Sequence, residues 1–282
     1  MTAAWSKEES LASRAGCRDR VGASFVAARA WNRYVRSVVD PPFLLQVSLK
    51  REQVVDASVY PFVVPAIGAL DNLPLANVTY FVGENGSGKS TILEAIAVAA
   101  GFNAEGGTSN FAFSTRATES PLHRCIRLAR SSRRPRTGFF LRAESFYNVG
   151  SEIDRLGVGD SYGGRSLHEM SHGESFLALM QHRFGGSGLY ILDEPEAALS
   201  PARQLAFLRR LHDLVMEGSQ FLIATHSPMV LAYPGATIYR LDERGLWDTP
   251  YEALEHVTLT RDFLNHRDRF VGRLLDEEAD EL

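Results

Sequence analysis

The sequence is poor in cysteine and has no long apolar run. Its only cysteines, Cys17 and Cys125, form no CxxC motif and no Cys/His cluster, which argues against a disulfide framework and against a zinc site. No apolar stretch approaches the ~20 residues of a membrane-spanning helix. The chain also does not open with an apolar segment followed by a small-residue cleavage site. We therefore expect a cytoplasmic protein without an integral membrane segment.

The sequence also lacks a large excess of either charge. A net charge of −4 over 282 residues provides no overall attraction to nucleic acid, so such binding would have to come from a local basic patch. Apolar residues make up 45% of the chain, which is ordinary for a folded core. The length suits one large α/β domain or two small ones.

The most specific motif is a glycine-rich loop between an expected strand and an expected helix. Residues 83–91 read Gly-Glu-Asn-Gly-Ser-Gly-Lys-Ser-Thr and match the phosphate-binding P-loop pattern. A β-branched and aromatic run, residues 78–82, precedes the loop, and an apolar helical pattern follows it to Ala100, with Gly101 as its stop. This context predicts that Lys89 reaches the β- and γ-phosphates of a nucleoside triphosphate and that the Ser90 hydroxyl holds Mg²⁺.

Two further expected strands end in polar residues that suit phosphate chemistry. Residues 189–192 are apolar and are followed by Asp193 and Glu194; the first acid can hold the Mg²⁺ shell and the second can polarise an attacking water. Residues 220–224 are apolar after the initial Gln220 and are followed by Thr225 and His226. At the carboxyl end of a central parallel strand, His226 would face the same crevice as the P-loop.

A serine motif precedes the Asp-Glu strand. Ser171, Gly173 and Glu174 open an expected helix over residues 176–182, and a serine followed three residues later by a glutamate forms a capping box. A well-capped helix needs no ligand, so this pattern also fits a purely structural role. The functional alternative is that the helix start and the Ser171 hydroxyl bind the γ-phosphate of a nucleotide on another subunit.

Five motifs follow one another along the chain: the P-loop, the serine motif, the Asp-Glu strand, the segment Glu196-Ala197-Ala198-Leu199-Ser200-Pro201 and the strand before His226. In this order they resemble the motif set of ABC-class ATPases over most of the chain, from about Phe43 to about Leu241. The resemblance implies an α/β P-loop fold with a mostly parallel central sheet, flanking helices, an antiparallel N-terminal β portion and a short helical signature subdomain. It implies ATP hydrolysis with Mg²⁺ by a homodimer that holds ATP between its subunits. The nucleotide-binding residues would be Gly83, Glu84, Asn85, Gly86, Ser87, Gly88, Lys89, Ser90 and Thr91, with Ser171 and Gly173 as the signature; Asp193 would be the Walker B acid, Glu194 the catalytic base and His226 the switch histidine.

The chain departs from transporter ATPases at two positions. No Gln follows the expected strand over residues 138–141, so we assign the metal-contacting position to Glu144. The signature reads Met-Ser-His-Gly-Glu, and its last residue is shared with the DNA-repair and chromosome-structure branch. That branch carries a coiled coil between these motifs, whereas the 26 residues from 145 to 170 are glycine-rich and fit no heptad repeat. The pattern resembles compact stand-alone bacterial ATPases.

The flanking segments are less specific. Residues 1–40 hold six arginines and fit an extension that is helical in part, residues 41–250 fit the ATPase domain with its helical subdomain at about 145–185, and residues 251–282 fit a helical segment with an acidic tail. Tyr60 or Phe62, on a strand-like stretch over residues 59–64, would stack on adenine or would belong to the core.

An arginine-rich segment supplies a local basic patch. It contains Arg124, Arg127, Arg130, Arg133, Arg134 and Arg136. The spacing by three of the first three predicts one side of a helix, which would contact a phosphate backbone or be a solvated face. Three uses of the ATPase cycle follow: nucleic-acid maintenance or defence, energising a transporter, and a nucleotide switch that regulates an unidentified protein partner.

Overall fold

The computed structural model describes residues 40–104, 106–107, 120–142 and 172–275. Contacts within the chain divide it into two units, residues 1–38 and 39–282, and all the described residues lie in the second. The predicted domain boundaries at residues 40 and 250 stay predictions. Residues 1–39, Cys17, Glu144, Ser171 and the acidic tail from residue 276 lie outside the described residues.

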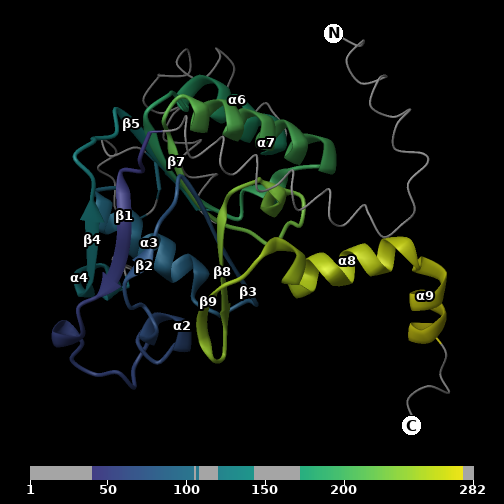
Figure 1. Cartoon of the computed structure of the whole chain (residues 1–282), viewed down its shortest axis with the longest axis horizontal. Coiled ribbons are helices and arrows are strands. Elements are labelled where there is room, and N and C mark those ends of the chain that lie inside the picture. Colours follow the sequence, from purple (N-terminus) through teal and green to yellow (C-terminus); the bar gives the residue numbers. More distant parts are fainter. Residues whose placement is uncertain (1–39, 105, 108–119, 143–171, 276–282) are drawn as a thin grey trace. The chain divides into compact units, whose positions relative to one another are not determined.

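A mostly parallel sheet of six strands forms the centre of the unit (Figure 1). Its strand order is β5-β6-β7-β3-β8-β9, and only the β8–β9 pair is antiparallel. The strands are β3 (Val78–Gly83), β5 (Thr137–Leu141), β6 (Gly188–Asp193), β7 (Gln220–Ala224), β8 (Thr237–Asp242) and β9 (Gly245–Asp248). Strands β3, β6 and β7 are almost continuously apolar and buried, as expected for parallel strands that are covered on both faces. The predicted α/β fold is confirmed.

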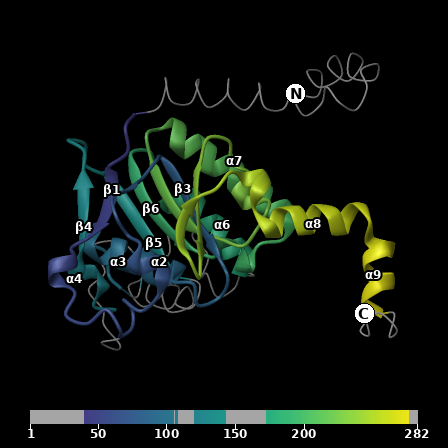
Figure 2. The same cartoon turned by 60° about the horizontal axis from the view of Figure 1, so that its bottom comes forward.

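The two faces of this sheet pack against different elements. Tyr80 and Tyr190 lie in a core cluster with helices α6 (His172–Arg183) and α7 (Pro201–Met216), while Phe81 and Ile191 lie in a second cluster with helix α3 (Lys89–Ala100). The alternation follows from the strand geometry, because successive side chains point to opposite faces. Figure 2 shows α3 and α7 on the two sides of the strands.

A second, antiparallel sheet has the order β2-β1-β4, as predicted for the N-terminal portion. Its strands are β1 (Leu44–Leu49), β2 (Leu73–Pro74) and β4 (Ile126–Arg130). Apolar residues of β1 belong to the same core cluster as α3. The P-loop helix is therefore held between the two sheets.

Short helices and a helical C-terminal segment complete the described part of the chain. They are η2 (Arg51–Gln53), α2 (Pro65–Gly68), α4 (Leu122–Cys125), η5 (Pro195–Ala198), η6 (Val230–Ala232), η7 (Tyr251–Ala253), α8 (Glu255–Asn265) and α9 (Arg267–Leu275). None of the described helices is both long enough and apolar enough to cross a membrane.

The structure corrects the predicted strand over residues 59–64. Turns occupy this stretch, and α2 begins at Pro65, because Pro61 and Pro65 lack the N–H groups that a strand ladder requires. Phe62 packs against the core cluster around α3, whereas Tyr60 is exposed and its hydroxyl lies 2.9 Å from the Thr91 hydroxyl. A contact of Tyr60 with adenine stays a prediction.

The structure also corrects the predicted helical arginine stripe. Arg124 lies in α4, but Arg127 and Arg130 lie in β4, which pairs with β1 from Leu49 to Leu44. Burial of Ile126 against β1 and the core outweighed the spacing of three that suggested a helix. The basic segment is therefore a strand followed by a loop.

Candidate functional site

The P-loop connects β3 to α3 in a conformation that depends on glycine. Gly86 has a φ of 82° and Gly88 a φ of 97°, which lie in the left-handed region that residues with a Cβ atom rarely adopt. A Cβ atom on Gly83 would lie 2.3 Å from the carbonyl oxygen of Leu241. The loop can therefore turn tightly at the N-terminus of α3, where free backbone N–H groups and the helix dipole favour an anion.

Lys89 is the first residue of α3 and is buried, with 4% of its surface exposed. Its ammonium donates hydrogen bonds to the carbonyl oxygens of Gly83 (2.7 Å) and Glu84 (3.0 Å). Burial lowers the pKa of Lys89, and the carboxylates of Glu194 and Asp193 oppose this effect. The loop therefore curves around a positive charge.

Ser90 and Asp193 meet although strand β7 lies between β3 and β6 in the sheet. The Ser90 hydroxyl donates a hydrogen bond of 3.2 Å to Oδ1 of Asp193. Asp193 is buried at the carboxyl end of β6, and this burial raises its pKa from 3.8 to about 6, although the Ser90 hydrogen bond acts in the opposite direction. A carboxylate and a hydroxyl side by side are the hard oxygen ligands that Mg²⁺ prefers.

Because the charge of Asp193 is buried, we expect its removal to increase the thermal stability of the chain by an amount that depends on pH. The pKa of this carboxyl is higher in the folded chain than in the unfolded chain, so the free energy of unfolding falls as pH rises from about 4 to above 6. The total fall corresponds to about 3 kcal/mol. Without nucleotide or metal, Asp193→Asn should raise the thermal midpoint at pH 8 by roughly 5 °C or more. The gain should fall to roughly half at pH 5, where the folded carboxyl is largely protonated.

The control for this experiment is Asp248→Asn, which changes an exposed aspartate of β9. It should leave the thermal midpoint almost unchanged at both pH values. A gain from Asp193→Asn that is equally large at pH 5 and pH 8 would contradict a buried carboxylate as its cause.

Glu194 adopts a backbone conformation that is unusual for a residue with a side chain. Its φ of 49° and ψ of 53° lie in the left-handed region, immediately after β6. Such strain is found at positions where the surrounding structure holds a side chain for function. Oε1 of Glu194 lies 3.6 Å from Nε2 of His226. The backbone N–H of His226 donates a hydrogen bond of 2.7 Å to Oε1 of Glu196, which fixes the segment that carries the histidine.

The structure brings most of the predicted residues together. Lys89 and Ser90 at the start of α3, the carboxyl end of β6 and the segment after β7 surround one location, as the contacts above establish. Gly173 lies buried in the first turn of α6, whereas Ser171 and Glu144 lie outside the described residues. Ser87 contributes a buried hydroxyl that has no hydrogen-bond partner among the described residues.

A cavity of about 230 Å³ that was not predicted from the sequence lies beside the P-loop, and Glu84, His226, Arg240 and His256 line it. His256 lies in α8, and its Nε2 is buried without a hydrogen-bond partner in the described part of the chain. Burial lowers the pKa of His256, and His226 contributes to the same effect. No local pattern marks this histidine, because only the fold brings α8 to the end of β3.

The residues present fit a nucleoside triphosphate with Mg²⁺. The left-handed glycines, the buried Lys89 ammonium and the unpartnered Ser87 hydroxyl suit phosphate oxygens, and the Ser90–Asp193 pair suits the metal. Among the described residues, no group of three or more His, Cys, Asp or Glu side chains could hold a metal by itself. Phosphate oxygens of a bound nucleotide would supply further ligands to such a metal.

Comparison with known protein families places the two halves of this site in ATPase domains. Residues 72–136, which include the P-loop, match the model "AAA domain", and residues 148–232, which include Asp193, Glu194 and His226, match the model "AAA domain, putative AbiEii toxin, Type IV TA system". Each match covers less than half of the chain. A search of curated proteins finds no match.

Two of the solved structures that match this chain are an SMC head domain and an ATP-binding cassette. The SMC head domain from Thermotoga maritima is 18% identical, with a TM-score of 0.40 over 74% of this chain and 99% of that one. An ATP-binding cassette of an ABC transporter in its ADP conformation is 17% identical, with a TM-score of 0.40 over 82% and 99% of the two chains.

The sheet order, the P-loop between β3 and α3, the Asp-Glu pair at the end of β6 and the two AAA-domain matches agree with one another. Together they indicate an ATP-binding P-loop ATPase, two segments of which are similar to AAA-domain models.

Proposed function

We propose that this chain hydrolyses ATP to ADP and phosphate as a head-to-tail dimer. The observation that carries the proposal is the convergence of Lys89, the Ser90–Asp193 pair and the Glu194–His226 pair on one end of the parallel sheet. Ligands of α/β proteins bind at this edge, at the carboxyl ends of the strands.

Each side chain has a role that follows from its position. The P-loop N–H groups and Lys89 would bind the β- and γ-phosphates and offset the charge that develops on them. Glu194 would accept a proton from the water that attacks the γ-phosphorus, while the bond to the β-phosphate oxygen breaks. His226, 3.6 Å from this carboxylate, would orient it and contact the γ-phosphate.

Ser90 and Asp193 would hold Mg²⁺, and Glu144 stays a proposed third ligand. When bound, the metal supplies positive charge that stabilises the phosphate oxygens. The dimer would complete the site, since the partner subunit's Ser171 and Gly173 would add an anion-binding helix start to each ATP. Hydrolysis would then separate the two subunits, which makes the dimer a switch.

A complementation experiment tests the composite site. Ser171→Arg would disrupt the signature of a subunit, and Lys89→Ala would disrupt its P-loop. Each variant alone should therefore lose at least 90% of its ATP turnover, which is the tenfold loss expected when ~1.4 kcal/mol of stabilisation is removed. A mixed dimer keeps one intact site, which joins the P-loop of the first variant to the signature of the second. Mixing the two should therefore restore phosphate release.

The restored rate should rise as the inactive variants approach equal amounts. A mixture that stays as inactive as its components would contradict the trans arrangement. Turnover by Ser171→Arg alone at the wild-type rate would contradict it as well.

We place this cycle in cytoplasmic nucleic-acid maintenance or defence. The family model that matches residues 148–232 carries the description of a putative AbiEii toxin of a type IV toxin–antitoxin system, which supports the defence reading. The arginine-rich segment supports contact with nucleic acid. Nucleic-acid-stimulated phosphate release that falls as salt is raised would bear out this role, and release that nucleic acid leaves unchanged would contradict it.

A further inference from the structure

A second cavity lies at the opposite end of the central sheet from the ATP site. It has a volume of about 140 Å³, and it adjoins Leu189 at the start of β6, Gly138 at the start of β5 and Ala100 at the end of α3. Arg130, Arg133, Arg134 and Arg136 line it, and no Asp or Glu does. Four positive charges around one cavity repel one another. Each must therefore either be neutralised by contacts within the protein or be available to a negatively charged ligand.

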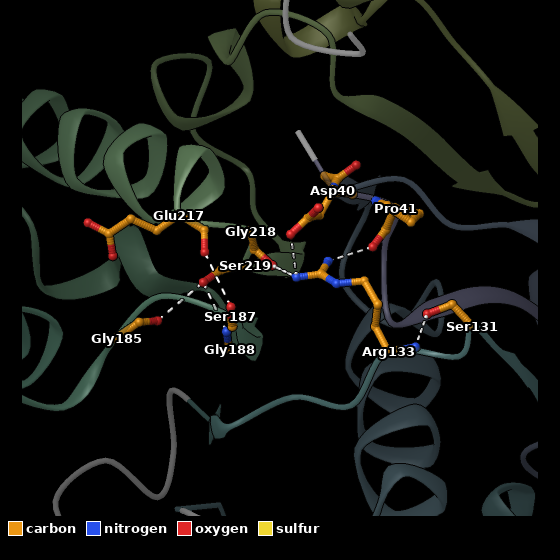
Figure 3. Close-up of polar contacts among 11 residues, drawn as sticks. Asp40, Pro41, Ser131, Arg133, Gly185, Ser187, Gly188, Glu217, Gly218 and Ser219 are labelled. Atoms are coloured by element: carbon orange, nitrogen blue, oxygen red, sulfur yellow. Dashed lines mark hydrogen bonds and ion pairs between the residues drawn. The ribbon is translucent and has the colours of Figure 1, made fainter. Parts of the chain in front are cut away.

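One of the four arginines, Arg133, is held by contacts within the protein. Its guanidinium pairs with Asp40 at 3.0 Å and donates hydrogen bonds to the carbonyl oxygens of Pro41 (2.7 Å) and Gly218 (3.1 Å) (Figure 3). It also stacks on the Phe43 ring at 4.6 Å from the centroid. Its side chain is only 20% exposed. Arg133 therefore joins the start of β1 to the turn before β7 and is not available to a ligand.

The other three arginines have no carboxylate partner among the described residues. Arg130 donates a hydrogen bond of 2.9 Å to the carbonyl oxygen of Ala99, at the negative end of the α3 dipole. Arg134 has a single long contact of 3.4 Å, to the carbonyl oxygen of Ser131. Arg134 and Arg136 are exposed. Their guanidinium groups are charged hydrogen-bond donors at the rim of the cavity and are available to a ligand.

We propose that this cavity binds a phosphate group of a nucleic-acid backbone, with Arg134 and Arg136 as its main contacts and Arg130 in support. The planar guanidinium offers paired donors that match phosphate oxygens. The volume is smaller than the ~300 Å³ at which pockets begin to enclose drug-sized ligands, so it suits one phosphate group of a chain that continues outside.

The same geometry argues against base-specific reading. The aromatic residues of the cavity, Phe43 and Phe102, are 2% and 9% exposed, and the Phe43 ring already carries Arg133. Bases therefore have no free aromatic surface on which to stack. Binding should depend on phosphate charge and not on sequence, and it rests on the nucleic-acid role proposed above.

The experiment measures fluorescence anisotropy of a labelled single-stranded DNA oligonucleotide and of the matching duplex, in the absence of ATP. The full chain should bind in a salt-dependent way. The double variant Arg134→Glu/Arg136→Glu should bind at least tenfold more weakly, and the slope of log affinity against log salt should fall by about two. The milder pair Arg134→Gln/Arg136→Gln should show a smaller loss in the same direction.

The matched control is Arg244→Glu/Arg269→Glu, which makes the same change in net charge at two exposed arginines elsewhere. It should retain near wild-type affinity. Equal losses from both charge reversals, or no binding by the wild-type chain, would overturn the proposal. So would displacement of the strand by inorganic phosphate or a mononucleotide at equal phosphate concentration, because the cavity would then be a small-anion site. A difference between strand and duplex identifies the form bound.

Two further measurements separate this proposal from the ATPase proposal. The thermal midpoint of the Arg134/Arg136 variants should match wild type, whereas Arg133→Ala should lower it, since Arg133 holds the fold together. Basal ATP turnover of the Arg134/Arg136 variants should be unchanged. If oligonucleotide binding falls as expected while the ATPase complementation fails, the cavity assignment stands and the catalytic proposal does not; the reverse pattern has the reverse meaning.

Discussion

Replacement of Glu194 by Gln is expected to lower ATP turnover by roughly 10²- to 10⁴-fold, the range that general-base catalysis supplies, while ATP still binds. The amide has the shape of the carboxylate but cannot accept the proton of the attacking water. The P-loop, Lys89 and the Ser90–Asp193 pair are untouched by this change. A chain that binds ATP without hydrolysing it should accumulate as the ATP-bound dimer, which size-exclusion chromatography with light scattering would detect.

The matched control is Glu243→Gln, at an exposed turn between β8 and β9. It should retain wild-type turnover and should dimerise only as wild type does. If Glu194→Gln hydrolyses ATP at the wild-type rate, Glu194 is not the base. If turnover is lost but no dimer forms with ATP, the catalytic assignment survives and the head-to-tail switch does not.

Replacement of Lys89 by Ala is expected to weaken ATP binding by roughly 100-fold or more. Hydrogen bonds to charged groups contribute about 1.5–3 kcal/mol each, and the Lys89 ammonium is expected to contact two phosphate groups. In this structure the ammonium donates hydrogen bonds to the carbonyl oxygens of Gly83 and Glu84 at 2.7 and 3.0 Å. It is thus already held inside the loop when the nucleotide arrives, and little ordering of the side chain is required.

Titration with a fluorescent ATP analogue would measure this loss. Lys50→Ala is the control, because Lys50 contacts Gln53 and the carbonyl oxygen of Arg124, away from the P-loop. It should bind the analogue as wild type does. An affinity for the analogue that Lys89→Ala leaves within about twofold of wild type would rule out the phosphate role of this lysine.

Local sequence patterns identified the elements that carry the site. The apolar runs before Gly83, Asp193 and Thr225 became the buried strands β3, β6 and β7, because an uninterrupted apolar run of this length is stable when both faces of a strand are covered. Gly101 ended α3 in the left-handed conformation, as expected for a helix stop. These patterns involve residues that are neighbours in the sequence, so they can be recognised without the tertiary structure.

The arginine segment shows where local patterns fail. A spacing of three between arginines occurs in helices and also in segments that are not helical. Here the segment became a strand because β4 pairs with β1, which lies about 80 residues earlier in the chain. The sequence also does not distinguish Arg133, which stabilises the fold, from Arg134 and Arg136, which face solvent. It depends on where Asp40, Phe43 and Gly218 lie after folding.

The sequence by itself determined the class of ligand, since a P-loop between strand and helix binds phosphate through backbone groups that glycine makes accessible. Tertiary structure decided which distant residues lie beside the P-loop: Ser90 contacts Asp193 although β7 lies between their strands, Glu194 lies near His226, and His256 of α8 lines the adjoining cavity. These contacts form because burial of apolar strands in one parallel sheet brings their polar carboxyl ends to a common edge, and no local pattern encodes the order of the strands.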